Sequence, residues 1–195
     1  MKRIRALASA ALTMAVLLSL AGPASATTYS VLGCKFNGSD PSIWYFKGGI
    51  VTTKYWDATG AGAARWNAVT VPGTFYPTTG GSYQVYVNEM SFVDPTIWAQ
   101  TQGACSTPGA HPASSWAGNQ VTLTWATEGA AGLTTTQLRM VATHELGHGM
   151  GLDHISTTSC SGTKSVMVQG TLKWTCTWGT EPWQNDIDNV IYVYN

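Results

Sequence analysis

The sequence predicts a single domain of α+β class, because strand-like and helix-like patterns alternate in a chain of one-domain size. Residues 83–87 and 121–125 alternate between apolar and polar side chains, as half-buried strands do. Residues 53–68 and 182–194 instead space their apolar side chains at helical period. A further helix is indicated over 134–149 by a capping signal at its start.

The first 26 residues predict a cleaved export signal. Three basic residues lie within positions 2–5, an apolar run covers 6–20, and Ala24-Ser25-Ala26 is a small-residue cleavage site. The apolar run is shorter than the ~20 residues that a membrane-spanning helix needs. We therefore expect a secreted, extracellular protein with no membrane segment after cleavage and a single domain over 27–195.

The charge balance excludes a strongly basic nucleic-acid-binding protein. Beyond the signal, seven basic residues stand against ten acidic ones, a net charge of −3. Four cysteines remain, and an even count in an exported protein predicts two disulfides out of three possible pairings. We favour Cys160–Cys176, which closes a short loop, and hence Cys34–Cys105. A zinc site made of cysteines is disfavoured, since no C-x-x-C spacing occurs.

The first half of the chain predicts a strand and a helix. Residues 42–46 are a short aromatic and aliphatic run ahead of two glycines, as expected of a first strand. The helix over 53–68 contains Gly60 and Gly62, which weaken it, and Pro72-Gly73 stops it. One face of this helix carries Trp56, Thr59, Ala63 and Trp66.

Residues 100–119 are rich in Gly, Pro, Ser and Ala, which predicts a long surface loop held through Cys105. The loop contains His111. A second metal site there is conceivable, but a lone loop histidine without a nearby histidine or carboxylate is usually just solvated.

Two helices are predicted in the second half. Thr134 and Gln137 have capping-box spacing, and a helix over 138–149 follows, ending at glycines that include Gly151. The last helix runs over 182–194 with a proline in its first turn. Its apolar face is Ile187, Val190, Ile191 and Tyr194.

Residues 144–154 have the pattern H-E-x-x-H-x-x-G-x-x-H. On a helix, His144 and His148 lie one turn apart, so both imidazoles can bind one Zn²⁺ ion at about 2.0–2.1 Å. Gly151 can adopt a positive φ, and the resulting turn would bring in His154 as the third ligand. Three protein ligands leave a fourth position for water, as in catalytic zinc sites.

Glu145 follows the first of these histidines and is predicted to be a general base. Zinc acidifies water to a pKa of about 7 and polarises a carbonyl, so the carboxylate would take a proton from the attacking water. It would then pass that proton to the leaving amine. The alternative is a helix with incidental histidines, but three of the chain's four histidines lie in this short segment.

The 144–154 segment resembles the zinc-binding signature of the metzincins and is most similar to their matrixin-like branch. That family has a methionine turn beneath the metal, and Ser165-Val166-Met167, 13 residues after His154, resembles it. Taken alone, Met167 would more often be ordinary core packing. The resemblance extends weakly over most of the remaining chain, and only the 144–167 block is diagnostic.

The resemblance implies a metzincin-like fold, a twisted, mostly parallel five-stranded sheet with three helices and an active-site cleft. It also implies a zinc endopeptidase of protein or peptide substrates, with specificity set by a wall at 168–176. In the family an antiparallel edge strand pairs with extended substrate, but its position is not evident from this sequence. The residues implied as metal ligands and base are His144, His148, His154 and Glu145.

Two departures from the family pattern affect these expectations. Matrixins usually bind a second, structural zinc upstream of the catalytic helix, and only His111 is available there, so we expect one zinc ion. Many matrixins also carry a long prosegment with a zinc-binding cysteine. Cys34 could be such a switch, but an odd cysteine would then remain, so the disulfide is preferred. A Ca²⁺ ion is conceivable but has no support in the sequence.

Two other functions stay open. The many Trp and Tyr residues could form the exposed platform of a carbohydrate-binding or adhesive module with a zinc site, although the placement of Trp56, Trp66 and Trp125 indicates core burial. A zinc hydrolase of small amides would share the metal chemistry. Glu145 favours catalysis, because a binding protein has no chemical use for it. We expect a monomer without nucleic-acid or membrane partners.

Overall fold

The structure is a computed structural model that describes residues 29–195. The predicted export signal, residues 1–26, lies outside the described residues. Within the described part, no helix combines the length and the apolar character needed to cross a membrane.

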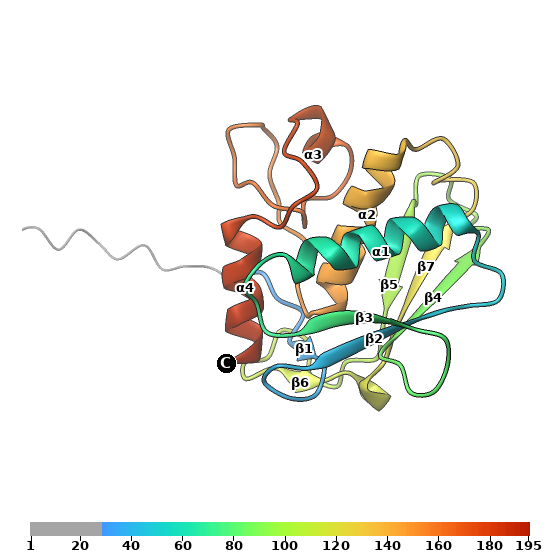
Figure 1. Ribbon diagram of the computed structural model, residues 1–195. Coiled ribbons are helices and arrows are strands. Elements are labelled where there is room, and N and C mark those ends of the chain that lie inside the picture. Colours follow the sequence, from blue (N-terminus) through green and yellow to red (C-terminus); the bar gives the residue numbers. More distant parts are fainter. Residues whose placement is uncertain (1–28) are drawn as a thin grey trace, which may run out of the picture.

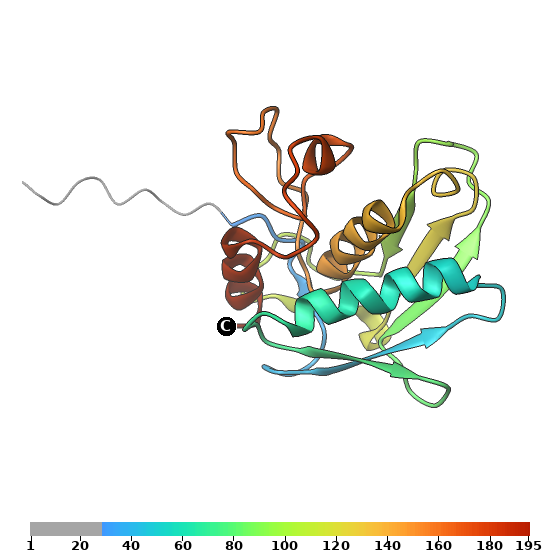
Figure 2. The same cartoon turned by 45° about the horizontal axis from the view of Figure 1, so that its top comes forward.

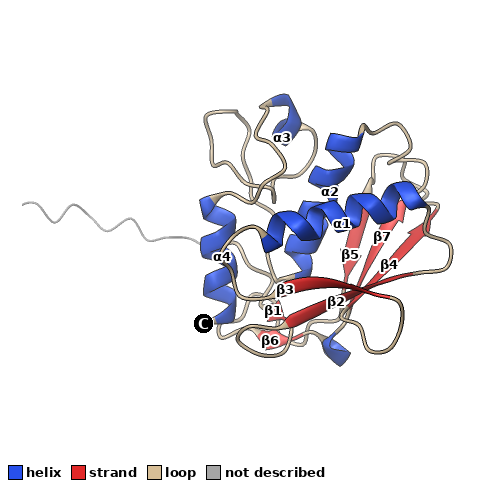
Figure 3. Ribbon diagram, in the orientation of Figure 1, coloured by secondary structure: helices blue, strands red, loops and turns tan. Residues whose placement is uncertain are grey.

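A five-stranded sheet forms one layer of the domain (Figures 1 and 3). Its strands are β2 (Ser42–Lys47), β3 (Thr74–Thr78), β4 (Val85–Met90), β5 (Ala99–Gln102) and β7 (Val121–Ala126). They lie in the order β3-β2-β4-β7-β5, and only the edge strand β5 is antiparallel to its neighbour. The predicted mostly parallel five-stranded sheet is therefore confirmed. A separate parallel pair joins β1 (Cys34–Lys35) to β6 (Ser114–Ser115).

The helices are α1 (Thr53–Asn67), α2 (Thr135–Gly149), α3 (Leu172–Thr175) and α4 (Gln184–Tyr194), with a short 3-10 turn at Ala117–Asn119. Helices α1 and α2 pack against each other on one face of the sheet, while α4 lies near β1 (Figures 1 and 2). The three predicted helices correspond to α1, α2 and α4. The short α3 was not predicted and belongs to the long excursion between α2 and α4.

The core sets the position of α2. Two buried tryptophans donate their indole N–H groups to its backbone: Trp66 of α1 to the carbonyl of Thr143, and Trp116 to the carbonyl of Gly149, both at 2.8 Å. The two accepting residues, Thr143 and Gly149, flank residues 144–148 on either side. The two hydrogen bonds therefore restrain that part of α2 against sliding along the helix axis. The fully buried strand side chains beneath the helices include Ile43, Val85, Val87 and Leu123.

Two disulfides join Cys34 to Cys105 and Cys160 to Cys176, and no described cysteine is free. The first bond attaches the loop after β5 to β1, as expected for a loop held through Cys105. Since Cys34 is buried and bonded, it is not available as a zinc-binding switch. The second bond closes the segment that contains α3.

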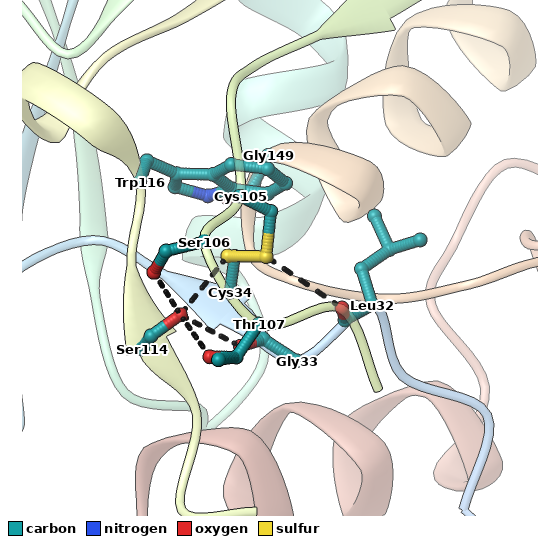
Figure 4. The surroundings of a disulfide bond; sticks show 9 residues. All are labelled: Leu32, Gly33, Cys34, Cys105, Ser106, Thr107, Ser114, Trp116 and Gly149. Atoms are coloured by element: carbon teal, nitrogen blue, oxygen red, sulfur yellow. Dashed lines mark hydrogen bonds between the residues drawn. A yellow bond between two sulfur atoms is a disulfide. The ribbon is translucent and has the colours of Figure 1, made fainter. Parts of the chain in front are cut away.

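A small polar cluster surrounds the first disulfide (Figure 4). Ser114 of β6 accepts hydrogen bonds from the hydroxyls of Ser106 and Thr107, at 3.3 and 3.0 Å, and donates to the carbonyl of Gly33 at 3.4 Å. The β1–β6 pair is thus held by main-chain pairing, side-chain hydrogen bonds and a covalent link together.

The predicted loop over 100–119 is wrong at both ends. Residues 99–102 form β5, which pairs with β7 from Ala99–Trp125 to Gln102–Thr122, and residues 114–115 form β6. Both strands are formed by hydrogen bonds between main-chain groups. These bonds do not require alternating apolar and polar side chains, which was the pattern used to predict strands. The polar sequence Ala-Gln-Thr-Gln therefore hid the edge strand.

Two element boundaries also differ from prediction. Strand β4 covers 85–90 and not 83–87, because its register with β7 pairs each residue as far as Met90. Helix α4 begins at Gln184 and not at residue 182, since the carboxylate of Asp186 caps it by accepting the Trp183 N–H at 2.8 Å. Its predicted apolar face is partly wrong, because Ile191 is exposed while Asp186 is buried.

Gly62 allows α1 and α2 to approach closely. A Cβ at this position would lie 2.8 Å from the backbone and Cβ of Ala142, a distance that real Cβ atoms do not tolerate. On the same helix, a Cβ at Gly60 would meet nothing closer than the hydroxyl of Tyr45, at 3.7 Å. The glycines that weakened the helix prediction thus have different structural roles.

We predict that Gly62→Ala lowers the free energy of unfolding by about 1–3 kcal/mol, because the added methyl overpacks the helix interface. The matched variant Gly60→Ala should instead raise it by about 0.5–1 kcal/mol, since alanine favours the helix and the site has room. Urea denaturation of the two variants measures both values. Equal effects of the two substitutions would contradict this account of the α1–α2 contact.

Candidate metal centre and active site

Helix α2 presents the first part of the signature. It begins at the predicted capping box: the Thr134 hydroxyl accepts from the Gln137 N–H at 3.3 Å, and the Gln137 side chain accepts from the Thr134 N–H at 2.9 Å. From this start the helix places His144 and His148 one turn apart. Both are at most 9% exposed, so the two imidazoles are buried within the domain, and their ring centroids lie 4.7 Å apart.

The chain leaves α2 through Gly151, whose φ of 98° confirms the predicted left-handed turn. The Gly151 N–H donates to the carbonyl of His148 at 2.9 Å, and its own carbonyl accepts from the Leu32 N–H at 2.7 Å. A Cβ here would collide with the carbonyl oxygen of Cys34. Both the backbone conformation and the close approach therefore require glycine, and the turn returns His154 toward α2.

The three imidazoles meet at their Nε2 atoms. The separations are 3.1 Å for His144–His148, 3.0 Å for His148–His154 and 3.3 Å for His144–His154. Three nitrogens each about 2.0–2.1 Å from one tetrahedral ion would lie roughly 3.3–3.4 Å apart. The three nitrogens therefore fit a zinc ion. Within residues 29–195, these histidines are the one cluster of three or more side chains that could hold a metal ion.

Hydrogen bonds fix which nitrogens face the shared point. His144 Nδ1–H donates to the carbonyl of Val166, and His148 Nδ1–H donates to the carbonyl of Leu152, each at 2.8 Å. The Nε2 lone pairs of both rings are thus left free. Burial lowers the pKa of all three imidazoles, that of His144 well below its usual range. Neutral imidazole is the form that binds a metal.

Glu145 lies beside this cluster with an unusual carboxylate. Its side chain is buried, and Oε2 has no hydrogen-bond partner in the described structure. Burial raises the pKa of the carboxyl. A buried polar atom without a partner calls for an explanation, and a water or substrate group beside the imidazoles would supply the missing bond.

Met167 packs beneath the helix, and a buried aspartate shapes the turn around it. Asp186 of α4 accepts from the Ser165 hydroxyl and, at 3.0 Å, from the Val166 N–H. Ser165 in turn accepts from the Met167 N–H at 2.8 Å. The fully buried Met167 contacts Gly147, which lies between the two helical histidines. Because the same turn carries the carbonyl that orients His144, Asp186 supports the imidazole cluster indirectly.

A cleft of about 740 Å³ opens over the cluster. It is lined by the three imidazoles and Glu145, by residues 96–101 around β5, and by residues 169–171 and Lys173 after the methionine turn. The hydroxyl of Thr101 donates to the carbonyl of Glu145 at 2.9 Å, so the edge strand is fastened directly to α2. The edge strand that the sequence did not reveal therefore borders the site.

Sequence reasoning missed Lys173, which also lines the cleft. Only 3% of this residue is exposed, and its Nζ lies 3.2 Å from Nδ1 of His144. Burial lowers the pKa of its ammonium group to about 8. One signal was available, because Lys173 is the only basic residue in the predicted specificity wall, 168–176.

His111 does not join the cluster. It stacks on Tyr192 of α4, with ring centroids 4.0 Å apart, and its Nε2 lies 3.0 Å from the Tyr192 carbonyl. The structure thus gives this loop histidine a packing partner, whereas the sequence suggested solvent alone. The four residues that the sequence grouped, His144, Glu145, His148 and His154, do lie together.

The sequence pattern of the family described as Matrixin matches residues 78–195, which is more than half of the chain. The chain belongs to the matrixin family. It is accordingly a zinc metalloendopeptidase whose substrates are peptides or proteins.

A comparison with curated proteins yields no match. Among solved structures, this matrixin is similar to high choriolytic enzyme 1, a hatching enzyme zinc-protease from the medaka fish Oryzias latipes, with a TM-score of 0.47 and 11% identity. The alignment covers 83% of this chain and 92% of the fish protein.

We predict that Asp186→Ala lowers the free energy of unfolding of this matrixin by about 3 kcal/mol or more, since several buried donors lose their acceptor. Asp186→Asn should lower it less, because the amide oxygen can still accept from the N–H groups of Val166 and Trp183. Urea denaturation together with zinc titration checks both. The zinc dissociation constant should rise more for Ala than for Asn. An unchanged free energy of unfolding in Asp186→Ala would show that the methionine turn is stable without this carboxylate.

Proposed function

We propose that the chain is a secreted endopeptidase in which His144, His148 and His154 hold one catalytic zinc ion and Glu145 is the general base. The observation that carries this proposal is the convergence of three Nε2 atoms within 3.0–3.3 Å, beside a buried carboxylate oxygen that has no partner. Family membership supports the metal and the reaction class. The residue roles rest on the geometry.

The chemistry divides between the metal and the chain. Zinc, when bound, polarises a carbonyl and acidifies water. The chain's own contribution is a proton acceptor: Glu145 Oε2 is free to take a proton from the attacking water and to release it to the departing amine. Burial, which raises the pKa of this carboxyl, brings it nearer to neutrality, where a group can both accept and donate a proton.

The substrate is proposed to be an extended peptide segment. Strand β5 is an edge strand with a single neighbour, so one row of its backbone N–H and C=O groups is unpaired within the sheet. The cleft is lined by residues 96–101, which include the first three residues of this strand. A peptide could therefore add to the sheet as a further strand, with one of its bonds placed over the imidazole cluster.

The proposed location is extracellular. Both disulfides favour an oxidising compartment, and the N-terminal pattern of the sequence is that of a cleaved signal, with residues 27–195 as the catalytic domain. We further propose a monomer without nucleic-acid partners, in keeping with its slightly acidic charge. Mass analysis of the protein from culture medium would establish where the mature chain begins.

A carbohydrate-binding or adhesive module is less well supported. Two of the tryptophans on which that function would depend, Trp66 and Trp125, are fully buried, and Trp56 is partly buried. Such a module also has no use for the orphaned oxygen of Glu145. A hydrolase of small amides would use the same chemistry at the metal, and the cleft volume of about 740 Å³ favours the larger substrate.

We predict that a zinc chelator abolishes cleavage of an unfolded protein substrate and that added Zn²⁺ restores it, since the three imidazoles have no other means of polarising a carbonyl. Digestion assays with and without chelator measure this. A small amide substrate assayed in parallel should be cleaved far less efficiently. Cleavage that persists without metal would rule out the proposed chemistry.

We also predict that Glu145→Gln binds one zinc ion per chain but loses roughly 10²–10⁴-fold in kcat, as expected when a positioned acid–base group is removed. His154→Ala should instead weaken zinc binding along with activity, because it removes a ligand. Zinc content by elemental analysis and kinetics on the same samples separate the two roles. Metal loss in Glu145→Gln with metal retained in His154→Ala would reverse the assignment.

A further inference from the structure

Lys173 is a buried cation without a carboxylate partner. No carboxylate oxygen lies within 4.0 Å of its Nζ, and the ion pair found in the described structure is Arg65–Glu181 on the surface. Two carboxylates act on its charge from beyond this distance, Glu145 and Asp186. Asp186 already accepts from Ser165, Val166 and Trp183. A buried charge normally has a partner, so this one requires an explanation.

The contact with His144 does not satisfy the ammonium group. Nζ lies 3.2 Å from Nδ1 of His144, but that nitrogen already uses its hydrogen to reach the carbonyl of Val166. A neutral ring with its hydrogen on Nδ1 has no lone pair there to accept from an ammonium. The contact with His144 therefore gives the ammonium group no acceptor, and the described structure shows no other hydrogen-bond partner for Nζ. Lys173 is among the residues that line the cleft.

The surroundings of Lys173 keep the charge in place. It lies in α3, and Cys176, at the end of that helix, is bonded to Cys160. Its neighbour Trp174 packs on Trp98 from the segment before β5, with ring centroids 4.5 Å apart. This aromatic contact joins the α3 segment to the β5 side of the cleft. The disulfide and the aromatic contact together hold the backbone around Lys173 in place.

We propose that Lys173 determines specificity by binding an acidic side chain, Asp or Glu, of the substrate residue next to the scissile bond. The inference rests on the proposed endopeptidase function and names its substrate class. A substrate carboxylate in this part of the cleft would supply the acceptor that the chain itself lacks. The site lies beside His144, so the residue that enters it must be close to the bond under attack.

A different role for Lys173 would be to act on the enzyme's own groups, by holding Glu145 or by orienting the ring of His144. Such a positioning role affects all substrates alike. A binding role affects only substrates that carry the acidic side chain. The ratio of kcat/KM between two peptides that differ by one charged group therefore separates the two.

The experiment uses the mature zinc-loaded enzyme and quenched peptides of one sequence, with Glu, Gln, Leu or Lys at each of the two residues that flank the cleaved bond. Wild type should prefer Glu over Gln at one of these positions by roughly 10- to 100-fold in kcat/KM, as expected for a hydrogen bond to a charged group. In Lys173→Met the ratio should fall to about one. In Lys173→Arg, which keeps the charge, a preference for Glu should remain.

Lys164→Met is the matched control, because Lys164 lies in the same disulfide-closed segment but is exposed and contacts the ring of Trp183. Its Glu-to-Gln ratio should equal that of wild type. Equal cleavage of Glu and Gln peptides by wild type at both positions would overturn the proposal, whether or not Lys173→Met folds. An unchanged ratio in a folded Lys173→Met would also overturn it. Failure of wild type to cut any peptide would refute the endopeptidase function itself.

Discussion

Three imidazole nitrogens held 3.0–3.3 Å apart are the constraint on which the rest of the structure depends. Lone pairs that converge so closely repel one another unless a cation lies between them, so the chain must hold each ring by other means. Two rings are one turn apart on α2, and the third arrives through Gly151. Hydrogen bonds from Nδ1 to backbone carbonyls orient the two helical rings.

Support for this cluster comes from outside the helix. Indole N–H groups of Trp66 and Trp116 hold α2 from the core. The carboxylate of Asp186 organises the methionine turn from α4, so a buried charge on the last helix acts on the ring of His144 through two steps of hydrogen bonding. Burial of several polar groups in one region is tolerable because most are paired. Oε2 of Glu145 has no partner, and Nζ of Lys173 contacts only Nδ1 of His144; both residues line the cleft.

The parts of the site that sequence could predict are those set by local geometry. Helical spacing brings His144 and His148 together in any helix, and only a glycine at 151 permits the turn that follows. Strand β5 could not be predicted, because main-chain hydrogen bonds form it and its mostly polar side chains give no strand pattern. The roles of Asp186 and Lys173 could not be predicted for another reason. Both depend on contacts with residues 20 or more positions away in the sequence. A single Asp or Lys in a sequence usually indicates a solvated surface position.

The segment just before β1 supports the turn that carries His154. The Ser30 hydroxyl donates to the carbonyl of His154 at 2.8 Å, and the Ser30 carbonyl accepts from the Asp153 N–H. The Leu32 N–H donates to the carbonyl of Gly151. Residues made early in synthesis thus complete the turn that carries the third imidazole, across a sequence separation of 124. Contacts of such long range close a large loop of chain, and forming them costs loop-closure entropy. The turn that carries the third imidazole is therefore stabilised from outside residues 144–154, and the local signature alone does not fix the position of His154.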